Sequence, residues 1–183
     1  LVGSEMCIRD SYICALSRLT EEKGIHYLIE AYQNVKTDKK LVIAGDTSDT
    51  DDYVMKLKKL AGNNPNIIFT GFVSGRTLEE LYSNAYVYTL PSDLEGMPLS
   101  LLEAMSYRNC CLVSNIQECA EVVEDRALIF KKSDVEDLQE KLQDACDHSE
   151  LVMKMKKQAA DFICKKYNWD EVVRETMKLY TRK

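Results

Sequence analysis

The strongest constraint in this sequence is a regular alternation between short apolar runs and longer segments with helical periodicity. The six apolar runs cover residues 12–17, 40–45, 66–71, 86–90, 110–114 and 127–130. Between them, apolar residues recur every three or four positions, as at Ile25, Leu28 and Tyr32, which is the period of a helix with one buried face. Strands apolar on both faces that alternate with such helices are typical of a parallel sheet. The sequence therefore predicts a doubly wound, mostly parallel, six-stranded α/β sheet of Rossmann-like type with helices on both faces.

The helical spacing recurs in the later segments and continues after the last apolar run. Further buried helix faces are predicted at Val54, Leu57 and Leu60, at Leu78, Leu81 and Tyr82, and at Leu99, Leu102 and Met105. Three more helices are predicted at about 134–147, 149–166 and 169–181, with Asp134 as the N-cap of the first. The last helix has an apolar stripe of Trp169, Val172, Val173, Met177 and Tyr180. This stripe either packs within the domain or meets a domain outside the sequence, and the pattern leaves both open.

Length and composition restrict the class of protein. The 183 residues fit one compact domain and leave no room for a second. The composition, 45% hydrophobic and 30% charged, is that of a soluble globular protein, and no apolar run approaches the roughly 20 residues of a membrane span. We therefore expect at most peripheral membrane association. The net charge of -6 argues against a nucleic-acid partner, because a polyphosphate backbone requires a broad basic face.

The first eleven residues do not continue the pattern. They have no clear period, and their apolar stretch is too short for a signal peptide. The folded domain is therefore predicted to cover residues 12–183, with residues 1–11 an unstructured or non-native leader. Because the first strand opens abruptly at Tyr12, we expect a further domain to precede it in the parent protein.

The seven cysteines are interpreted as structural thiols. They are scattered, their number is odd, and no CxxC pair occurs. Cys14, Cys110 and Cys111 lie inside apolar runs, where cysteine behaves as a small buried hydrophobic residue. We expect reduced thiols and a cytoplasmic location.

The segment 93–105, DLEGMPLSLLEAM, follows the fourth predicted strand and carries the clearest signal for a binding site. Gly96 permits close approach of the backbone, and Pro98 suits the first turn of a helix that continues through Leu99. Unpaired N–H groups and the helix dipole make such a helix start attractive to a phosphate. Open parallel sheets also bind their ligands at this edge, outside the carboxyl ends of the strands.

Charged residues gather at the same predicted edge. Arg18 and Lys23 follow the first strand and could neutralise a diphosphate. Glu95 and Glu103 could line one pocket and accept hydrogen bonds from sugar hydroxyls. Taken singly, the two glutamates are more typical of a solvated surface pair, and the two cations are equally compatible with the charged surface end of a helix.

Two further loops are weaker signals. The loop Gly71 to Gly75 offers glycines for backbone access and two apolar walls for a base, Phe72 and Val73. The acidic run at 49–52 resembles a metal-binding cluster, but we interpret it as a helix-capping run, and no metal site is predicted.

Together these motifs resemble the retaining glycosyltransferases of family 4, known as glycosyl transferases group 1, which have the GT-B fold. The resemblance rests on Ser17-Arg18-Leu19 with Glu22-Lys23-Gly24, Gly71-Phe72-Val73, Glu95-Gly96-Met97-Pro98-Leu99, Glu103-Ala104-Met105 and Glu121-Val122-Val123. It covers the chain from Tyr12 onward. It implies the C-terminal, nucleotide-sugar-binding half of such an enzyme, inactive alone because the N-terminal acceptor domain is absent from the sequence.

The resemblance also implies roles for individual residues. Catalytic roles fall to Arg18, Lys23 and Glu95, with the two cations holding the leaving diphosphate. Nucleotide-sugar binding falls to Val73, Ser74, Gly75, Glu95, Gly96, Met97, Pro98, Leu99 and Glu103, with Glu103 at the ribose and the Val73 loop at the base. The donor would be a UDP- or GDP-sugar and the acceptor a glycan or a lipid-linked precursor at the inner face of the membrane. Transfer would retain the anomeric configuration with no cofactor and no metal, assisted by the leaving phosphate as base.

Three residues depart from the family pattern: Arg108 stands where glycine is usual, Asn115 where aspartate is common, and Gln117 where glycine or proline is common. A left-handed backbone at Arg108 would be strained unless Asn109 adopts it instead. These departures suggest an alternative, a degenerate nucleotide-sugar-binding domain without catalysis. A nucleotide-sugar epimerase of the same architecture is a third hypothesis, which no residue supports.

Overall fold

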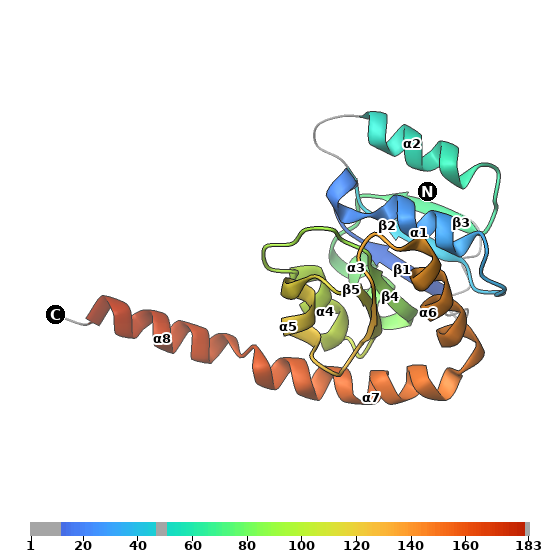
Figure 1. Cartoon of the computed structure of the whole chain (residues 1–183). Coiled ribbons are helices and arrows are strands. Elements are labelled where there is room, and N and C mark those ends of the chain that lie inside the picture. The colour runs from blue at the N-terminus through green and yellow to red at the C-terminus, as the bar shows by residue number, and fades with distance from the viewer. Residues whose placement is uncertain (1–11, 47–50, 182–183) are drawn as a thin grey trace.

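The sheet at the centre of the molecule confirms the predicted doubly wound topology (Figure 1). The computed structural model describes residues 12–46 and 51–181. Its strands are β1 (Tyr12–Leu16), β2 (Leu41–Ala44), β3 (Ile67–Gly71), β4 (Ala85–Leu90), β5 (Cys110–Ser114) and β6 (Leu128–Phe130). They lie in the order β3-β2-β1-β4-β5-β6, and every pairing is parallel. The order changes direction between β1 and β4, so a crevice for a ligand opens at the carboxyl ends of these two strands.

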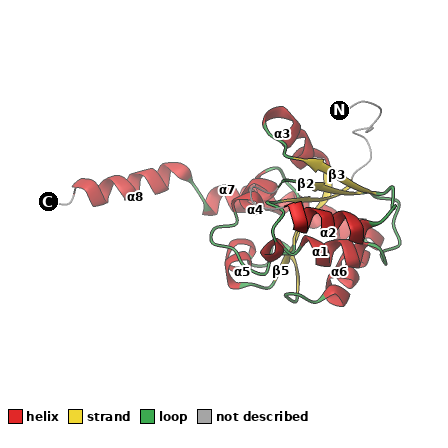
Figure 2. Ribbon diagram, turned by 90° about the horizontal axis from the view of Figure 1, so that it is seen from above, coloured by secondary structure: helices red, strands yellow, loops and turns green. Residues whose placement is uncertain are grey.

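Helices cover both faces of the sheet (Figures 1 and 2). They are the short 3-10 helix η1 (Glu21–Lys23), α1 (Ile25–Tyr32), α2 (Asp51–Ala61), α3 (Gly75–Asn84), α4 (Leu99–Ser106), α5 (Gln117–Val123), α6 (Val135–Asp147), α7 (Ser149–Lys166) and α8 (Trp169–Thr181). One core joins α1, α2 and α6 to the sheet, and another joins α4, α5 and α7 to it. Asp134 caps α6 as predicted, because its carboxylate accepts a hydrogen bond from the backbone N–H of Asp137 at 3.1 Å.

The cysteines within the strands are buried as predicted. Cys14 in β1 and Cys110 and Cys111 in β5 are fully covered, and all are free thiols. Burial raises the pKa of Cys14 to about 12, since an apolar environment disfavours the thiolate. These residues therefore serve packing. Cys7 lies outside the described residues.

The predicted buried face of α4 is confirmed in part, because Met105 is fully buried and Leu102 packs against the core. Leu101, Ala104 and Met105 are the residues that α4 buries, whereas the predicted Leu99 is 58% exposed. The pattern is wrong only at Leu99, which is the first residue of this 8-residue helix. The consequence is that Leu99, at the start of the helix, faces the crevice instead of the core.

Four residues of the stripe on α8 are exposed, and the side chain of Trp169 lies outside the described part of the structure. Val172, Val173, Met177 and Tyr180 are 49%, 56%, 56% and 82% exposed, and α8 projects away from the body of the molecule (Figure 1). The interpretation that it packs within the domain is therefore wrong. Among the described residues, no helix has the length and apolar character needed to cross a membrane.

Candidate functional site

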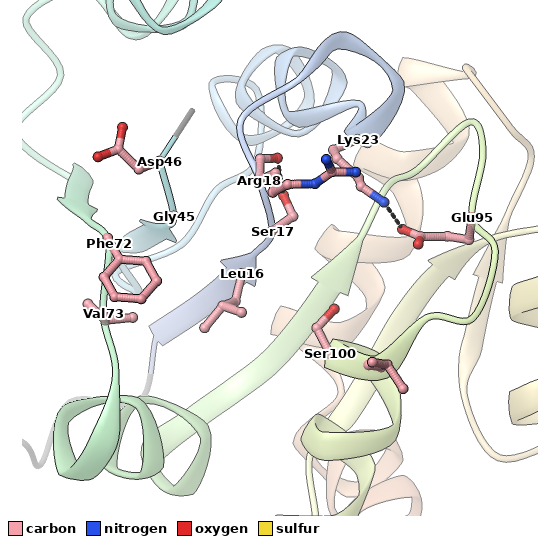
Figure 3. Close-up of a pocket in the computed structure, with 11 residues that line it drawn as sticks. Leu16, Ser17, Arg18, Lys23, Gly45, Asp46, Phe72, Val73, Glu95 and Ser100 are labelled. Carbon is pink, nitrogen blue, oxygen red and sulfur yellow. Dashed lines mark hydrogen bonds and ion pairs between the residues drawn. The ribbon is translucent and has the colours of Figure 1, made fainter. Parts of the chain in front are cut away.

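A pocket opens at the carboxyl edge of the sheet, where the crevice was predicted (Figure 3). Its volume is about 670 Å³, within the usual range for small-molecule sites. The lining residues come from the ends of β1, β2 and β3 and from the segment after β4. They are Leu16, Ser17, Arg18, Lys23, Gly45, Asp46, Phe72, Val73, Glu95, Leu99 and Ser100.

Two glycines allow the strand-end loops to meet at this edge. Gly24 has φ 64°, and a Cβ atom on it would lie 2.1 Å from the carbonyl oxygen of Pro91. Gly45 has φ 140°, and a Cβ atom there would lie 1.8 Å from the carbonyl oxygen of Ser17. Only glycine combines these backbone angles with such close approach. The two residues therefore fix how closely the loops after β1, β2 and β4 pack.

Asp93 ties the loop after β4 to two other segments. Its backbone N–H donates to the carbonyl of Glu22 at 2.8 Å. Its carboxylate accepts hydrogen bonds from the Tyr27 hydroxyl at 3.0 Å and the Ser133 hydroxyl at 2.7 Å. The loop that carries Glu95 is thus held by contacts on both sides.

Lys23 and Glu95 form a nearly buried ion pair in the pocket. The distance between Lys23 Nζ and Glu95 Oε1 is 2.9 Å, and the side chains are only 12% and 8% exposed. The same Oε1 accepts a hydrogen bond from the Ser92 hydroxyl at 2.6 Å, and the Ser114 hydroxyl donates to the Ser92 carbonyl. An ammonium carries three N–H donors, so pairing with Glu95 leaves Lys23 able to donate to a ligand as well.

Arg18 completes this side of the pocket, which we call the charged wall (Arg18, Lys23 and Glu95). Its side chain points toward Lys23 and Glu95 (Figure 3), and it is exposed at the end of β1. Among residues 12–46 and 51–181, no ion pair includes Arg18. The charged wall thus holds two cations and one carboxylate, which favours an anionic ligand.

The opposite side of the pocket carries three apolar side chains, with Asp46 beside them (Figure 3). We call it the apolar wall (Leu16, Phe72 and Val73). Phe72 is 75% exposed, although a large aromatic side chain gains free energy from burial. A flat apolar ligand group could cover it.

Glu103 lies on α4 one turn beyond Leu99 and Ser100, outside the lining of the pocket. Its Oε2 accepts a hydrogen bond from the Tyr82 hydroxyl at 3.0 Å. Burial, together with the Glu103 carboxylate, raises the pKa of Tyr82, so this hydroxyl keeps its proton and acts as a donor. The side chain of Glu103 is therefore oriented by Tyr82, although it remains exposed.

The structure brings part of the predicted site together. Arg18, Lys23, Val73, Glu95 and Leu99 line the pocket, whereas Ser74, Gly75, Gly96, Met97, Pro98 and Glu103 do not. Sequence reasoning missed Leu16, Ser17, Gly45, Asp46 and Ser100 as lining residues. The available signal was position, because most of them adjoin the carboxyl end of a predicted strand.

The acidic run after β2 lies partly outside the described residues, which omit 47–50. Where the structure does describe the chain, no group of three His, Cys, Asp or Glu side chains could hold a metal ion. The absence of a metal requirement stays a prediction.

The three departures from the family pattern lie outside the pocket lining. Arg108 itself adopts the left-handed backbone, with φ 61°, and Asn109 does not relieve it. This conformation costs about 1–2 kcal/mol for a residue with a Cβ atom. Asn115 accepts a hydrogen bond from the backbone N–H of Lys132 at 2.8 Å, and Gln117 donates to Glu121 on the surface of α5 at 2.7 Å.

Comparison with known proteins places this geometry in a family. A model of the family "Glycosyl transferases group 1" matches residues 9–162. An uncharacterised glycosyltransferase of Methanocaldococcus jannaschii is 32% identical over 179 residues, which cover 93% of this chain and 45% of the relative. O-antigen chain mannosyltransferase B of Escherichia coli is 27% identical over 92% of this chain and 45% of its own length. The chain thus spans about half the length of these curated relatives.

Solved structures share the fold at lower identity. The structure of Anabaena HepE in complex with UDP and glucose matches with a TM-score of 0.87 and 16% identity, over 95% of this chain and 49% of that one. The catalytic domain of cholesterol-alpha-glucosyltransferase from Helicobacter pylori matches with a TM-score of 0.73 and 21% identity, over 85% of this chain and 99% of that one. The fold, the pocket at the carboxyl edge and the family match agree: the chain belongs to the glycosyl transferases group 1.

Proposed function

We propose that this chain is the donor-binding domain of a retaining glycosyltransferase of family 4, and that it binds a UDP- or GDP-sugar. The observation that carries the proposal is the pairing of a charged wall and an apolar wall across one pocket at the topological switch point of the sheet. A nucleoside diphosphate has the matching parts, an anionic diphosphate and a flat base. HepE was solved with UDP and glucose, and the relatives include mannosyltransferases, which supports a nucleotide-sugar ligand.

Arg18 and Lys23 would hold the diphosphate. A guanidinium can donate two parallel hydrogen bonds to phosphate oxygens. The ammonium of Lys23 would share its donors between the phosphate and Glu95, which the 2.9 Å pair already places in the pocket. As the bond to the sugar breaks, negative charge grows on the diphosphate, so these cations would bind the transition state more tightly than the ground state.

The remaining predicted residues would bind the rest of the donor. Glu95 and the backbone that follows it, through Leu99, would contact the sugar and phosphate, and Glu103 would hold the ribose diol. The loop Val73 to Gly75, with the exposed ring of Phe72, would meet the base. The Tyr82 hydroxyl already orients the Glu103 carboxylate, which would leave the other oxygen to accept from the ribose.

The acceptor site is proposed to belong to a further, N-terminal domain of the parent protein. This chain covers 45% of the Methanocaldococcus relative, and transfer needs both substrates in one active site. We propose that the full-length parent acts in the cytoplasm on a glycan or lipid-linked acceptor, retains the anomeric configuration, and uses the leaving phosphate as base without a metal. The isolated domain is expected to bind the donor without turnover.

Metal-free binding of the nucleotide tests this proposal. Calorimetry with UDP and with GDP, in the presence of a chelator, is expected to show saturable binding that weakens as salt rises, because the contacts are ionic. Binding that appears only after Mg²⁺ or Mn²⁺ is added would contradict the metal-free assignment. If neither nucleotide bound under any condition, the proposed donor-binding function itself would be wrong.

Replacement of Glu103 tests the role proposed for the second glutamate. Glu103→Gln keeps the helix propensity of the position but removes the charge. It is expected to weaken nucleotide binding by roughly 1.5 to 3 kcal/mol, the value of a hydrogen bond to a charged group, with little change in melting temperature. An unchanged dissociation constant would exclude Glu103 from the site, and a lower melting temperature without ligand would instead identify a structural role through Tyr82.

A further inference from the structure

A second pocket, of about 800 Å³, lies at the opposite edge of the sheet from the donor pocket. Its lining includes Ser83, two residues before the start of β4, and Arg108, two residues before the start of β5, so it sits at the amino ends of these strands. Residues 150–158 of α7 form its other side. No residue lines both pockets. The two are therefore separate sites on one domain.

Cations dominate this second pocket. Arg108, Lys154, Lys156 and Lys157 line it, against the single carboxylate of Glu150. This concentration of positive charge occurs in a chain with a net charge of -6. Within the described residues, no ion pair includes Arg108, Lys154 or Lys157. Their charges are available to a ligand.

Arg108 lies at the pocket in a backbone conformation that is unfavourable for any residue except glycine. Asn109 is buried, and its side-chain amide donates to the carbonyls of Tyr82 and Ala104 at 2.9 and 3.0 Å. These bonds fix the turn into β5 and leave the preceding residue in the left-handed region, with φ 61°. Glycine would occupy this position without strain. The arginine therefore occupies this position although its left-handed backbone lowers the stability of the fold.

One lysine of α7, Lys156, is bonded to the sheet. The Lys156 ammonium donates to the carbonyl of Ala85 at 2.6 Å, at the first residue of β4, and burial lowers the pKa of this lysine. The bond anchors α7 at the amino edge of the sheet. Lys154 and Lys157 are three residues apart and so share one face of the helix. Together with Arg108, they give the pocket three exposed cations on two fixed elements.

Two large side chains add an apolar surface beside the cations. Met153 is 63% exposed and Tyr107 is 38% exposed, and both line the pocket. The Tyr107 ring stacks on Tyr82, with 5.5 Å between ring centroids, which holds it in place. A ligand that fits this pocket has an anionic group and a less polar part attached to it.

We propose that this pocket binds a phosphate ester, with the phosphate between Arg108, Lys154 and Lys157 and the ester group against Tyr107 and Met153. A phosphate offers several acceptor oxygens, which suits a guanidinium and two ammonium groups that line one pocket from different segments. The same chemistry is present in a free phosphate ester and in the headgroup of an anionic phospholipid. The inference does not depend on the function proposed for the first pocket.

Titration followed by NMR tests both sources of the ligand. Glycerol 3-phosphate is added to the chain, and the backbone amides of residues 107–109 and 150–158 are followed separately from those of Arg18 and Lys23. In parallel, cosedimentation is measured with phosphatidylcholine vesicles that contain or lack phosphatidylglycerol. Saturable shifts around Arg108 and α7 identify a free ester as ligand, and cosedimentation that requires phosphatidylglycerol identifies the headgroup.

Matched variants decide whether the response belongs to the pocket. Lys154→Gln/Lys157→Gln is expected to weaken binding at least about tenfold, because two charge-assisted hydrogen bonds are lost. Lys58→Gln/Lys59→Gln, which removes two exposed lysines from α2, is expected to leave it unchanged. Equal responses from the two variants, or neither saturable shifts nor lipid-dependent cosedimentation, would overturn the proposal.

A third variant separates binding from folding. Arg108→Gly removes both the cation and the backbone strain, so it is expected to raise the melting temperature while it weakens binding. A purely structural arginine would change the melting temperature alone, and unchanged binding in this variant would remove Arg108 from the site.

Discussion

The two walls of the donor pocket differ in how firmly the protein holds them. On the charged wall, Lys23 and Glu95 are nearly buried and bonded to each other, and a buried serine donates to the carboxylate. On the apolar wall, the ring of Phe72 is 75% exposed. The comparison indicates that folding alone holds the Lys23–Glu95 pair in place, whereas the surface proposed for the base is open before a ligand binds.

The largest effect is expected from disturbing the backbone behind the charged wall. In Gly24→Ala, the new Cβ atom would lie 2.1 Å from the Pro91 carbonyl oxygen at a φ of 64°, and the clash and the strain together should destabilise the fold by about 2–4 kcal/mol. Gly62→Ala is the control, because Gly62 has a similar φ of 60° with nothing within 4 Å. It should cost only about 1 kcal/mol. Urea unfolding measures both, and equal losses would show that the close approach of the two loops is unimportant.

A smaller effect is expected from breaking the ion pair of the charged wall. Lys23→Gln leaves the Glu95 carboxylate nearly buried without its cation, which should cost about 1–3 kcal/mol of stability and a similar amount of UDP affinity. The control is Lys56→Gln, since Lys56 pairs with Glu21 at 3.3 Å but both side chains are more than half exposed. Screening by water should keep its effect on stability below about 0.5 kcal/mol. If both variants kept wild-type stability and affinity, the charged wall would not be preorganised by this pair.

The smallest effect on stability is expected at the apolar wall. Phe72→Ala removes a ring that is already 75% exposed, so the free energy of unfolding should change by less than about 0.5 kcal/mol. Nucleotide affinity should fall by about 1 kcal/mol, the scale of a stacking contact with a base. Met55→Ala, at a residue 57% exposed on α2, should change neither quantity. If calorimetry gave the same affinity for both variants, the proposal that the base binds against this wall would be wrong.

The strands could be predicted from the sequence almost to the residue. The run at 110–114 coincides with β5, and the run at 12–17 exceeds β1 by one residue. Strands that are buried on both faces appear as continuous apolar runs, so burial alone marks their ends. The short helix α4 shows the limit, because its first residue, Leu99, follows the helical period but lines the pocket instead of packing in the core.

The composition of the site could be predicted only in part. Arg18 and Lys23 were recognisable as cations just after a strand. The contact of Lys23 with Glu95 joins positions 72 residues apart (95 minus 23), and no local pattern encodes such a pairing. Gly45 and Asp46 line the pocket because β2 lies beside β1 in the sheet. Strand order, which the alternation of runs leaves undetermined, decides which strand ends become neighbours.

The hydrogen bonds of Asp93 to Glu22, Tyr27 and Ser133 have a consequence for the kinetics of binding. A loop held by three hydrogen bonds to two other segments has lost most of its conformational freedom before a ligand arrives, so little further entropy is spent on ordering it. Association should then proceed without a slow rearrangement, at a rate set by diffusion and by attraction to the exposed guanidinium of Arg18. Under these conditions, nucleotides that differ in affinity differ mainly in their residence time on the protein.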